Sequence, residues 1–211
     1  MTLPEAAAGG RSQMALRYAR KTARREVTLA VPLGSVRHAH LPDEGSKAHL
    51  VTAVLKARCE DGEELELLGE PVRQLKPAAR ERLRARVGAL SPVIGLITNL
   101  NAWENISLPA AYHGRPPLEQ VARVTHEVLR TFGAEPRSFL SRVPDELGML
   151  ERKIAAFVRL LIAAPELAII DALNEGLSRE ECARIAGFEK EYRGRHPSGT
   201  LLFVDTKEED S

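Results

Sequence analysis

The chain has 211 residues, of which 44% are hydrophobic, 30 are basic and 29 are acidic, so its formal net charge at pH 7 is +1. This length can bury a complete core within one domain, and the balanced charge favours no charged partner. The sequence holds no signal-peptide core and no run near the ~18 continuous apolar residues of a membrane span, so we expect a cytoplasmic protein.

The beginning of the chain is basic. Its first 25 residues contain one acidic residue, Glu5, and six basic ones: Arg11, Arg17, Arg20, Lys21, Arg24 and Arg25. Such a segment can contact lipid headgroups or nucleic acid, but chain ends are more often solvated and poorly ordered. We therefore expect a basic, partly disordered arm over 1–17, one folded domain over 18–211 and no nucleic-acid partner.

The first half of the domain reads as strands and helices in alternation. The pattern predicts a strand over 26–31, a turn over 32–34, a second strand over 35–41, a loop over 42–45 and a helix over 47–58. A turn at 61–62 precedes a short strand over 63–68, and Pro77 opens a basic amphipathic helix that ends near Gly88.

The second half adds longer helices and two apolar strands. Apolar residues recur at helical spacing over 117–133, where Gly133 stops the run, and again over 144–163. The segments around Ile170 and Leu202 lack polar alternation, which suits a sheet covered on both faces. The pattern as a whole predicts an α/β fold with a helical insert.

The cysteines and histidines indicate no metal centre. Cys59 and Cys182 have no metal-like spacing, so we interpret both as reduced packing residues. Three separate histidines, His113, His126 and His196, are expected at the surface and form no ligand cluster in the sequence.

Four segments resemble, in chain order, the ATP-binding subunits of ABC transporters. They are EVTLAVPLGSVRHAHLPDEGSKAHLVTAVLKA (26–57) for the phosphate-binding loop, VGALSPVIGLITNLNAWENISLPAAYHG (87–114) for the Q-loop, VPDELGMLERKIAAFVRLLIAAP (143–165) for the signature helix and APELAIIDALNEGLS (164–178) for Walker B. The Q-loop segment is most similar to MCE-type lipid-trafficking transporters. The resemblance covers about 18–210 and implies a P-loop NTPase-like domain with an N-terminal antiparallel β sub-domain and a helical sub-domain at about 93–165.

The resemblance places the nucleotide-binding positions but changes most of their residues. Gly45, Ser46, Lys47 and Ala48 occupy the phosphate-binding stretch, while Leu41, Glu44 and Ser46 replace three glycines and Ala48 replaces the magnesium-binding hydroxyl. Tyr18 lies where the family places an aromatic residue against adenine, and its stacking is left open. Asp43 and Glu44 would repel a polyanion, since like charges at 4 Å cost about 4 kcal/mol at an effective dielectric of 20. We expect at most weak binding of ATP and Mg²⁺, with Lys47 either on phosphate or simply solvated.

The positions that would carry catalysis are changed as well, so the sequence offers no catalytic residue. Ala172 replaces the glutamate that handles the attacking water, Pro92 replaces the Q-loop glutamine and Thr206 replaces the switch histidine. Asp171 keeps the place of the metal-binding aspartate, although a lone carboxylate there can equally cap the next turn. Around Gly148 to Glu151 the signature loses its serine and both of its glycines.

The surface that receives the permease is better preserved. In the family the segment 97–105 meets the coupling helix of the membrane permease, and here Asn99, Leu100 and Trp103 are the docking candidates. The alternative is that Trp103 only anchors the helical part.

These features predict a degenerate ATP-binding-like subunit, peripheral on the cytoplasmic side of the inner membrane. Its partners would be a permease, of a lipid-transport system, and a second copy or another ATP-binding subunit; its role would be structural or regulatory. One alternative is an active ATPase in which Glu175 or Asp205 substitutes for a missing group. Another is a soluble adaptor without a permease, whose arm binds nucleic acid in a salt-dependent way.

Overall fold

The computed structural model describes residues 13–22, 26–114 and 116–206. Its strands are β1 (Met14–Lys21), β2 (Glu26–Pro32), β3 (Val36–Leu41), β4 (Glu63–Leu67), β5 (Glu70–Pro71), β6 (Val87–Leu90), β7 (Leu167–Asp171) and β8 (Thr200–Thr206). Its α-helices are α1 (Glu44–Lys56), α2 (Pro77–Arg84), α3 (Ala102–His113), α4 (Leu118–Thr131), α5 (Pro136–Leu140), α6 (Met149–Ala163), α7 (Arg179–Ile185) and α8 (Phe188–Arg195). Short 3₁₀ turns lie at η1 (Val72–Gln74), η2 (Pro92–Ile94) and η3 (Pro144–Glu146).

An antiparallel sheet in the order β2-β1-β4-β5 forms the N-terminal part of the fold. Strand β1 is central in it, since it pairs with both β2 and β4. Its arginines meet carboxylates across the sheet: Arg17 lies 3.8 Å from Glu66, and Arg20 lies 3.1 Å from Glu63. The expected boundary of the basic arm at residue 17 is therefore wrong, because residues 14–17 are held between two strands; residues 1–12 lie outside the described part.

A parallel sheet in the order β3-β8-β7-β6 carries the candidate site. Strand β7 is buried along its whole length and β8 along its first five residues, which confirms the two covered apolar strands expected around Ile170 and Leu202. The carboxyl ends of parallel strands meet at one edge of a sheet, and Leu41 pairs with Thr206 while Asp171 pairs with Val204 at that edge. The phosphate-loop, Walker B and switch positions are thus brought together.

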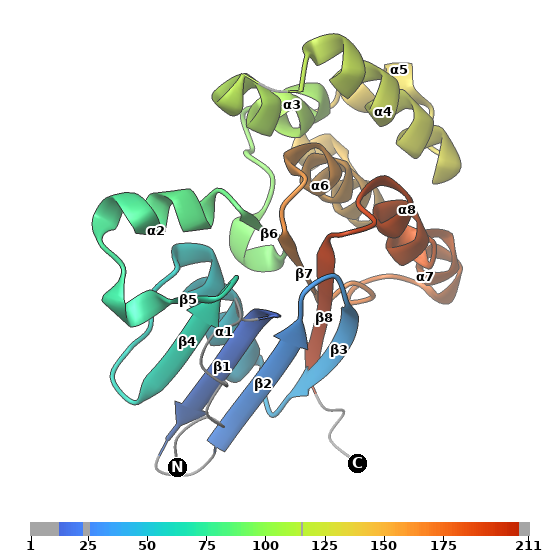
Figure 1. The fold of residues 1–211 in the computed structure, drawn as a ribbon. Helices are drawn as coiled ribbons and strands as arrows, with labels where there is room; N and C mark the ends of the chain where they lie inside the picture. Colours follow the sequence, from blue (N-terminus) through green and yellow to red (C-terminus); the bar gives the residue numbers. More distant parts are fainter. Residues whose placement is uncertain (1–12, 23–25, 115, 207–211) are drawn as a thin grey trace.

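The helices cover the parallel sheet and extend beyond it. In Figure 1, α3, α4 and α5 lie above the sheet, and α6 connects them to β7. One core lies between α3, α4, α6, α8 and the parallel sheet, and it includes the mutually contacting rings of Phe132, Phe157 and Phe188. A second core joins α1 to both sheets. The observed architecture is the expected α/β fold with an antiparallel sheet and a helical part.

Gly88 lies in strand β6, not at the end of a helix as its sequence context suggested. A Cβ at this position would stand 2.9 Å from Leu160 Cδ1 and 3.1 Å from Pro165 Cγ, so only glycine lets β6 pass this close to α6. The preceding helix α2 already ends at Arg84. Likewise the expected helix over 144–163 is the 3₁₀ turn η3 followed by α6 from Met149.

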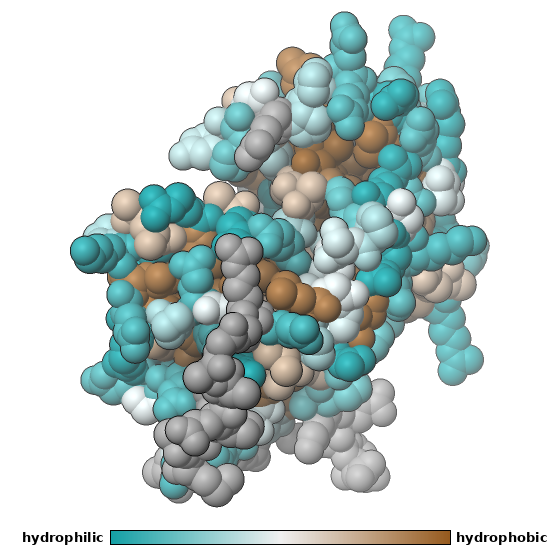
Figure 2. Space-filling view, in the orientation of Figure 1, coloured by the Kyte–Doolittle hydropathy of each residue, from teal (hydrophilic) through white to brown (hydrophobic). Residues whose placement is uncertain are grey.

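The surface is mainly hydrophilic on the face shown in Figure 2, with hydrophobic patches over the helical part and beside the antiparallel sheet. Large apolar side chains that are more than a third exposed include Val93, Ile97, Leu108, Tyr112 and Leu118. Within the described ranges, no helix is both long enough and apolar enough to cross a lipid bilayer.

Candidate functional site

Helix α1 begins at Glu44, about one turn earlier than the sequence suggested, and the residue before it caps its N-terminus. Asp43 is the N-cap: its Oδ1 accepts a hydrogen bond of 2.7 Å from the Ser46 amide, and its carbonyl accepts one of 3.1 Å from the Lys47 amide. Gly45 and Ser46 are therefore in the first helical turn instead of a loop. The N–H groups at a helix start are the donors that bind phosphate in P-loop proteins, and here a carboxylate takes one of them.

Lys47 faces the interior. Its side chain is almost fully buried, and its Nζ lies 2.9 Å from Glu44 Oε2 and 3.2 Å from Asp171 Oδ1. Burial alone would lower the pKa of Lys47, but Glu44 and Asp171 raise it above the ordinary lysine value. The expectation of a simply solvated lysine is wrong, because the ammonium is shared between two carboxylates. Ala48, next along the helix, is exposed.

Asp171 stands at the end of β7, and both of its oxygens have near neighbours. Its Oδ2 accepts a hydrogen bond of 2.6 Å from Ser91 Oγ, and its Oδ1 is the atom next to Lys47. The side chain contacts α1 and the segment after β6, and among the described residues it accepts no hydrogen bond from the turn that follows β7. Across the described part of the chain, no three histidine, cysteine or acidic residues gather where they could hold a metal ion.

Ala172, Pro92 and Thr206 lie near the carboxyl edge of the parallel sheet, at the positions that carry catalytic groups in the family. Ala172 is buried and has φ 53°, a left-handed backbone that disfavours larger side chains. Its carbonyl accepts a hydrogen bond of 2.6 Å from Lys153 Nζ. Pro92 is an exposed residue of η2, and Thr206 is the last residue of β8. None of the three places a carboxylate, amide or imidazole at this edge.

Lys153 is a neighbour of the site that the sequence did not single out. Burial lowers the pKa of Lys153, while the charges of Glu175, Asp171 and Asp205 oppose that effect. Glu175 and Asp205 are both exposed. Lys153 itself is half-buried, and its Nζ is held at the end of β7 by the Ala172 carbonyl.

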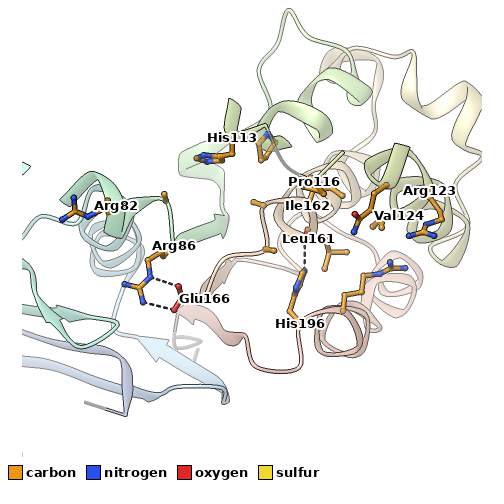
Figure 3. A pocket seen from close by; sticks show the side chains of 16 residues that line it. Arg82, Arg86, His113, Pro116, Arg123, Val124, Leu161, Ile162, Glu166 and His196 are labelled. Carbon is orange, nitrogen blue, oxygen red and sulfur yellow. Dashed lines mark hydrogen bonds and ion pairs between the residues drawn. The ribbon is translucent and has the colours of Figure 1, made fainter. Parts of the chain in front are cut away.

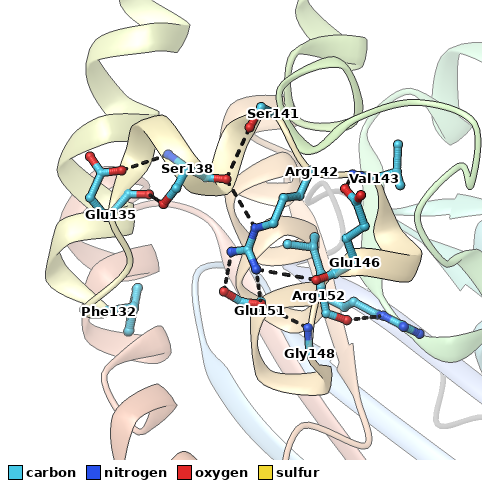
Figure 4. A network of polar contacts seen from close by, with 12 residues as sticks. Phe132, Glu135, Ser138, Ser141, Arg142, Val143, Glu146, Gly148, Glu151 and Arg152 are labelled. Atoms are coloured by element: carbon cyan, nitrogen blue, oxygen red, sulfur yellow. Dashed lines mark hydrogen bonds and ion pairs between the residues drawn. The ribbon is translucent and has the colours of Figure 1, made fainter.

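The start of α6 is closed by its own side chains (Figure 4). Glu151 accepts a hydrogen bond of 3.0 Å from the Gly148 amide and two from the guanidinium of Arg142, at 2.5 and 3.0 Å. Burial would raise the pKa of Glu151, but Arg142 and the Gly148 amide hold it below its ordinary value. Met149 is half exposed and Leu150 is buried. The helix start therefore presents a thioether and an internal carboxylate where the family presents serine and glycine.

The segment after β6 is held by a half-buried arginine, Arg159, and by a buried amide, Asn105. Arg159 donates hydrogen bonds to the carbonyls of Ile94 (2.9 Å) and Gly95 (3.1 Å), and burial lowers its pKa. The Oδ1 atom of the buried Asn105 accepts from the Ile97 amide at 2.7 Å, and its two Nδ2 hydrogens are shared among the carbonyls of Ile97, Leu100 and Asn101. These contacts fix the loop that leads into α3.

The docking candidates differ in exposure. Asn99 is exposed, Leu100 is half-buried, and Trp103 is half-buried against the helical core. Trp103 therefore packs on the helical part, in agreement with the interpretation of Trp103 as an anchor. Part of the residue is still accessible to a partner.

Tyr18 is not available to an adenine ring, which decides against the stacking that its position had left open. It is 1% exposed in β1, and its hydroxyl donates a 3.2 Å hydrogen bond to Glu63, a carboxylate that also contacts Arg20 and His49. Burial and Glu63 raise the pKa of Tyr18 far above the ordinary tyrosine value.

His196 also differs from expectation. It is half-buried, its Nε2 lies 3.0 Å from the Leu161 carbonyl, and burial lowers its pKa.

A parallel sheet with a phosphate-loop helix, a Walker B strand and a helical insert, next to an antiparallel sheet, defines an ABC-type ATP-binding cassette. Comparison with known proteins gives the same class. The chain is 30% identical over 167 residues to the uncharacterized ABC transporter ATP-binding protein YbbA of Escherichia coli K12, which covers 78% of this chain and 71% of the relative. The chain belongs to the ABC transporter ATP-binding protein family. No protein-family model matches it.

Other relatives and structures are more distant. The methionine import ATP-binding protein MetN of Brucella abortus is 24% identical over 184 residues, which is 87% of this chain and 48% of the relative. Among solved structures, the dimeric post-hydrolysis cassette MJ0796 bound to ADP and Pi superposes with a TM-score of 0.73 at 17% identity, over 91% of this chain and 88% of the other. CbiO1 of Clostridium perfringens, part of the transporter complex cbiONQ, gives a TM-score of 0.70 at 15% identity, over 93% and 80% of the two chains. These two structures support the fold.

Proposed function

We propose that this chain is a degenerate ATP-binding-type subunit of an ABC transporter, docked on a membrane permease in a structural or regulatory role. The observation that carries the proposal is the contact between Lys47 and Asp171, because the groups that would bind phosphate and metal neutralise each other inside the protein. A nucleotide would have to break this contact and replace the Asp43 carboxylate at the start of α1.

The second half of an ATP site is blocked in the same way. ABC cassettes such as the MJ0796 dimer act in pairs, and the resemblance implies that the signature helix of one subunit meets the nucleotide of the other. Here Glu151 occupies the donor at the start of α6, and Met149 projects from it. We therefore infer that neither composite site of a homodimer or a mixed dimer is competent.

The partner is a permease at the inner membrane, on whose cytoplasmic side the subunit sits as a peripheral protein. The exposed apolar residues Val93, Ile97, Leu108 and Tyr112 on and before α3 support a docking surface there. The resemblance of the segment 87–114 to MCE-type subunits favours a lipid as cargo, while the relatives named for methionine import are the competing indication. We also propose that the helical sub-domain extends from about residue 93 to about residue 165.

The test is to purify a tagged copy from membranes and to measure ATP turnover in the complex obtained. We expect one integral membrane protein to co-purify in stoichiometric amount, and we expect no ATP turnover that depends on this chain. Recovery of the chain alone from the soluble fraction, with salt-sensitive binding to DNA or RNA, would instead support an adaptor.

A second candidate function, an active ATPase, has one observation in its favour. Two carboxylates lie beside Ala172: the Glu175 amide donates a hydrogen bond of 3.3 Å to the Ala172 carbonyl, and Asp205 follows Val204, the strand partner of Asp171. Magnesium-dependent turnover that disappears in both Glu175→Gln and Lys47→Met variants would establish this alternative.

A further inference from the structure

Helix α2 lies in a strongly basic segment of the chain. Residues 73–86 contain six basic side chains and one acidic one. The basic residues are Arg73, Lys76, Arg80, Arg82, Arg84 and Arg86, and the acidic one is Glu81. Figure 1 shows α2 at the outer edge of the molecule, beside the antiparallel sheet, where one side of the helix is open to solvent. We call residues 73–86 the basic ridge.

The basic side chains of the ridge lie along two sides of the helix. Leu83 is buried and marks the face that packs on the protein. Residues four positions apart share a side of a helix. The two rows are Lys76, Arg80 and Arg84 on one side, and Arg82 and Arg86 on the other. Between the rows, the exposed residues of the crest include Ala78 and Ala85, so the ridge presents small side chains flanked by cations.

Neighbouring carboxylates compensate for part of this charge. Arg84 lies 2.8 Å from Glu81, and Figure 3 shows the ion pair that Arg86 makes with Glu166. Arg84 also donates a hydrogen bond of 3.3 Å to the Leu55 carbonyl. The end of α1 is therefore next to the ridge, and its basic residues add to the same surface.

Four exposed basic residues of these two segments make no ion pair with any residue in the described part of the chain. They are Lys56 and Arg58 at the end of α1 and Lys76 and Arg82 of the ridge. Figure 3 shows the Arg82 side chain directed away from Arg86 and its carboxylate partner. Like charges that gather without partners repel each other, so contact with an anionic surface lowers the free energy of this part of the molecule.

The composition of the ridge favours a lipid surface over a nucleic acid. Proteins that hold single-stranded nucleic acid use grooves with aromatic side chains on which the bases stack, and residues 73–86 contain no aromatic residue. At a bilayer surface, by contrast, arginines and lysines on the flanks of a helix extend their long stems to the lipid phosphates. Two rows of cations beside a crest of small residues match this arrangement.

The ridge lies on the same side of the molecule as helix α3, which follows the candidate docking segment. Arg82 and Ala85 line one cavity together with Pro109 and His113 of α3. Strand β6, which joins the ridge to the segment before α3, has only four residues, a length of about 13 Å. A subunit that docks on a permease through residues 97–105 therefore holds the ridge near the same membrane.

We propose that the basic ridge binds the headgroups of anionic phospholipids, with Lys76 and Arg82 as its principal contacts and Lys56 and Arg58 at its border. The inference rests on the proposed function only for the presence of a membrane beside the subunit. The binding itself requires the chain and the lipid alone, so it can be measured without a permease.

The first experiment measures binding of the purified full chain to lipid vesicles by co-sedimentation at low salt. Vesicles of phosphatidylcholine are compared with vesicles in which about one third of the lipid is the anionic phosphatidylglycerol. Each basic residue near an anionic membrane strengthens binding about fivefold. We therefore expect binding to the anionic vesicles to be at least about tenfold stronger, and to weaken as added salt shortens the screening length.

Three results of this experiment would overturn the proposal. One is equal binding to both kinds of vesicle, or binding to neither. Another is a short DNA duplex that binds the chain more tightly than the anionic vesicles do. The third is release of the chain by inorganic phosphate that exceeds its release by chloride at the same ionic strength, because the ridge would then be a site for free phosphate.

Paired charge reversals test the assignment to the ridge. Lys76→Glu/Arg82→Glu should weaken binding to the anionic vesicles by about twentyfold or more, because two cations are replaced by anions. The control Arg179→Glu/Lys190→Glu reverses one exposed arginine of α7 and one exposed lysine of α8, far from α2 in Figure 1. Both variants change the net charge equally, so equal losses of binding would overturn the assignment. If the ridge variant does not fold, Lys76→Gln and Arg82→Gln are measured singly, and unchanged binding in both contradicts it.

The second experiment separates the ridge from the proposed function. A photo-crosslinking residue is placed at the exposed Ala78 of α2 or at the exposed Tyr112 of α3, and the adducts formed in intact membranes are identified by mass spectrometry. Phospholipid adducts from Ala78 together with a membrane protein trapped from Tyr112 support both proposals. A membrane protein but no lipid trapped from Ala78 refutes the lipid surface and keeps the permease partner. Lipid adducts without a membrane protein at either position keep the lipid surface and refute the proposed function, and the absence of both adducts refutes both.

Discussion

Lys47 Nζ lies 3.2 Å from Asp171 Oδ1, with both residues no more than 3% exposed. The contact joins the first turn of α1 to the end of β7, and Ser91 holds the other carboxylate oxygen. In a working P-loop protein the equivalent lysine and aspartate face phosphate and magnesium. In this protein the residues at the same two motif positions contact each other inside the fold.

Lys47→Met is expected to destabilise the protein. It leaves the buried Asp171 carboxylate without its cation, and breaking a buried ion pair by removing one partner costs roughly 3–5 kcal/mol. We expect about 3 kcal/mol, because Ser91 still donates a hydrogen bond to the Asp171 carboxylate. Urea unfolding measures the loss, and Lys56→Met, an exposed lysine at the end of the same helix, should change stability by less than about 0.5 kcal/mol. Equal stabilities of the two variants would contradict the assigned contact.

Mg-ATP is expected to bind weakly or not at all. The phosphate must displace the Asp43 cap and separate Lys47 from Asp171, beside the exposed carboxylate of Glu44. Isothermal titration calorimetry of the full chain with Mg-ATP measures this. A low-micromolar affinity would show that the first turn of α1 rearranges around nucleotide, and the proposed role would then be wrong.

Ala172→Glu is expected to give no ATP turnover and a less stable protein. The new carboxylate would be buried beside Asp171 at a residue with φ 53°, while the phosphate and switch contacts are still missing. Catalytic groups that act as a unit are strongly non-additive. Steady-state ATPase assays and thermal unfolding test both parts, with Ala48→Glu, at an exposed position of α1, as the control for added charge. Clear magnesium-dependent turnover in Ala172→Glu would refute the prediction.

A mixed dimer with a competent ATP-binding subunit is expected to hydrolyse ATP far more slowly than the all-competent dimer. The signature face fails because Glu151 and Arg142 close the start of α6 and Met149 projects from it. The measurement is ATPase activity per reconstituted complex with the permease. Comparable activity in the mixed and all-competent complexes would mean that this face still completes the partner's site.

His196 makes the stability depend on pH on the acid side of neutrality. Burial lowers its pKa in the folded protein from the ordinary value of 6.5. The unfolded chain therefore binds more protons between the two pKa values, so this contribution is complete above about pH 6.5 and is lost as pH falls through the lower, folded value. Chemical unfolding at pH 5 and pH 7 should show a smaller difference in His196→Gln than in the parent chain. The exposed His126, replaced by glutamine, should leave the difference unchanged.

The sequence alone determined the fold class and the order of its parts. Local spacing was sufficient for this, because apolar periodicity fixes α4 and the buried strands β7 and β8 within single segments, and because four motifs follow one another in family order. Local pattern failed where contact with a neighbouring strand or helix decides the conformation. Residues 14–17 look like a basic tail but pair with two strands, and Gly88 looks like a helix end but is the one residue small enough to fit under Leu160.

Only the tertiary structure decided which groups the altered site residues contact. Sequence spacing places Lys47 and Asp171 in motifs, but it cannot show that they contact each other, nor that Ser91 reaches Asp171 from 80 positions away. Sequence spacing likewise put Tyr18 at the position of an adenine-stacking residue, although its ring is buried and its hydroxyl bonds to Glu63. The physical reason is that burial and charge pairing arise from segments that meet only when both sheets and their helices are assembled. The pairing of charges, in addition to the identity of the motifs, is therefore the basis of the proposed degenerate role.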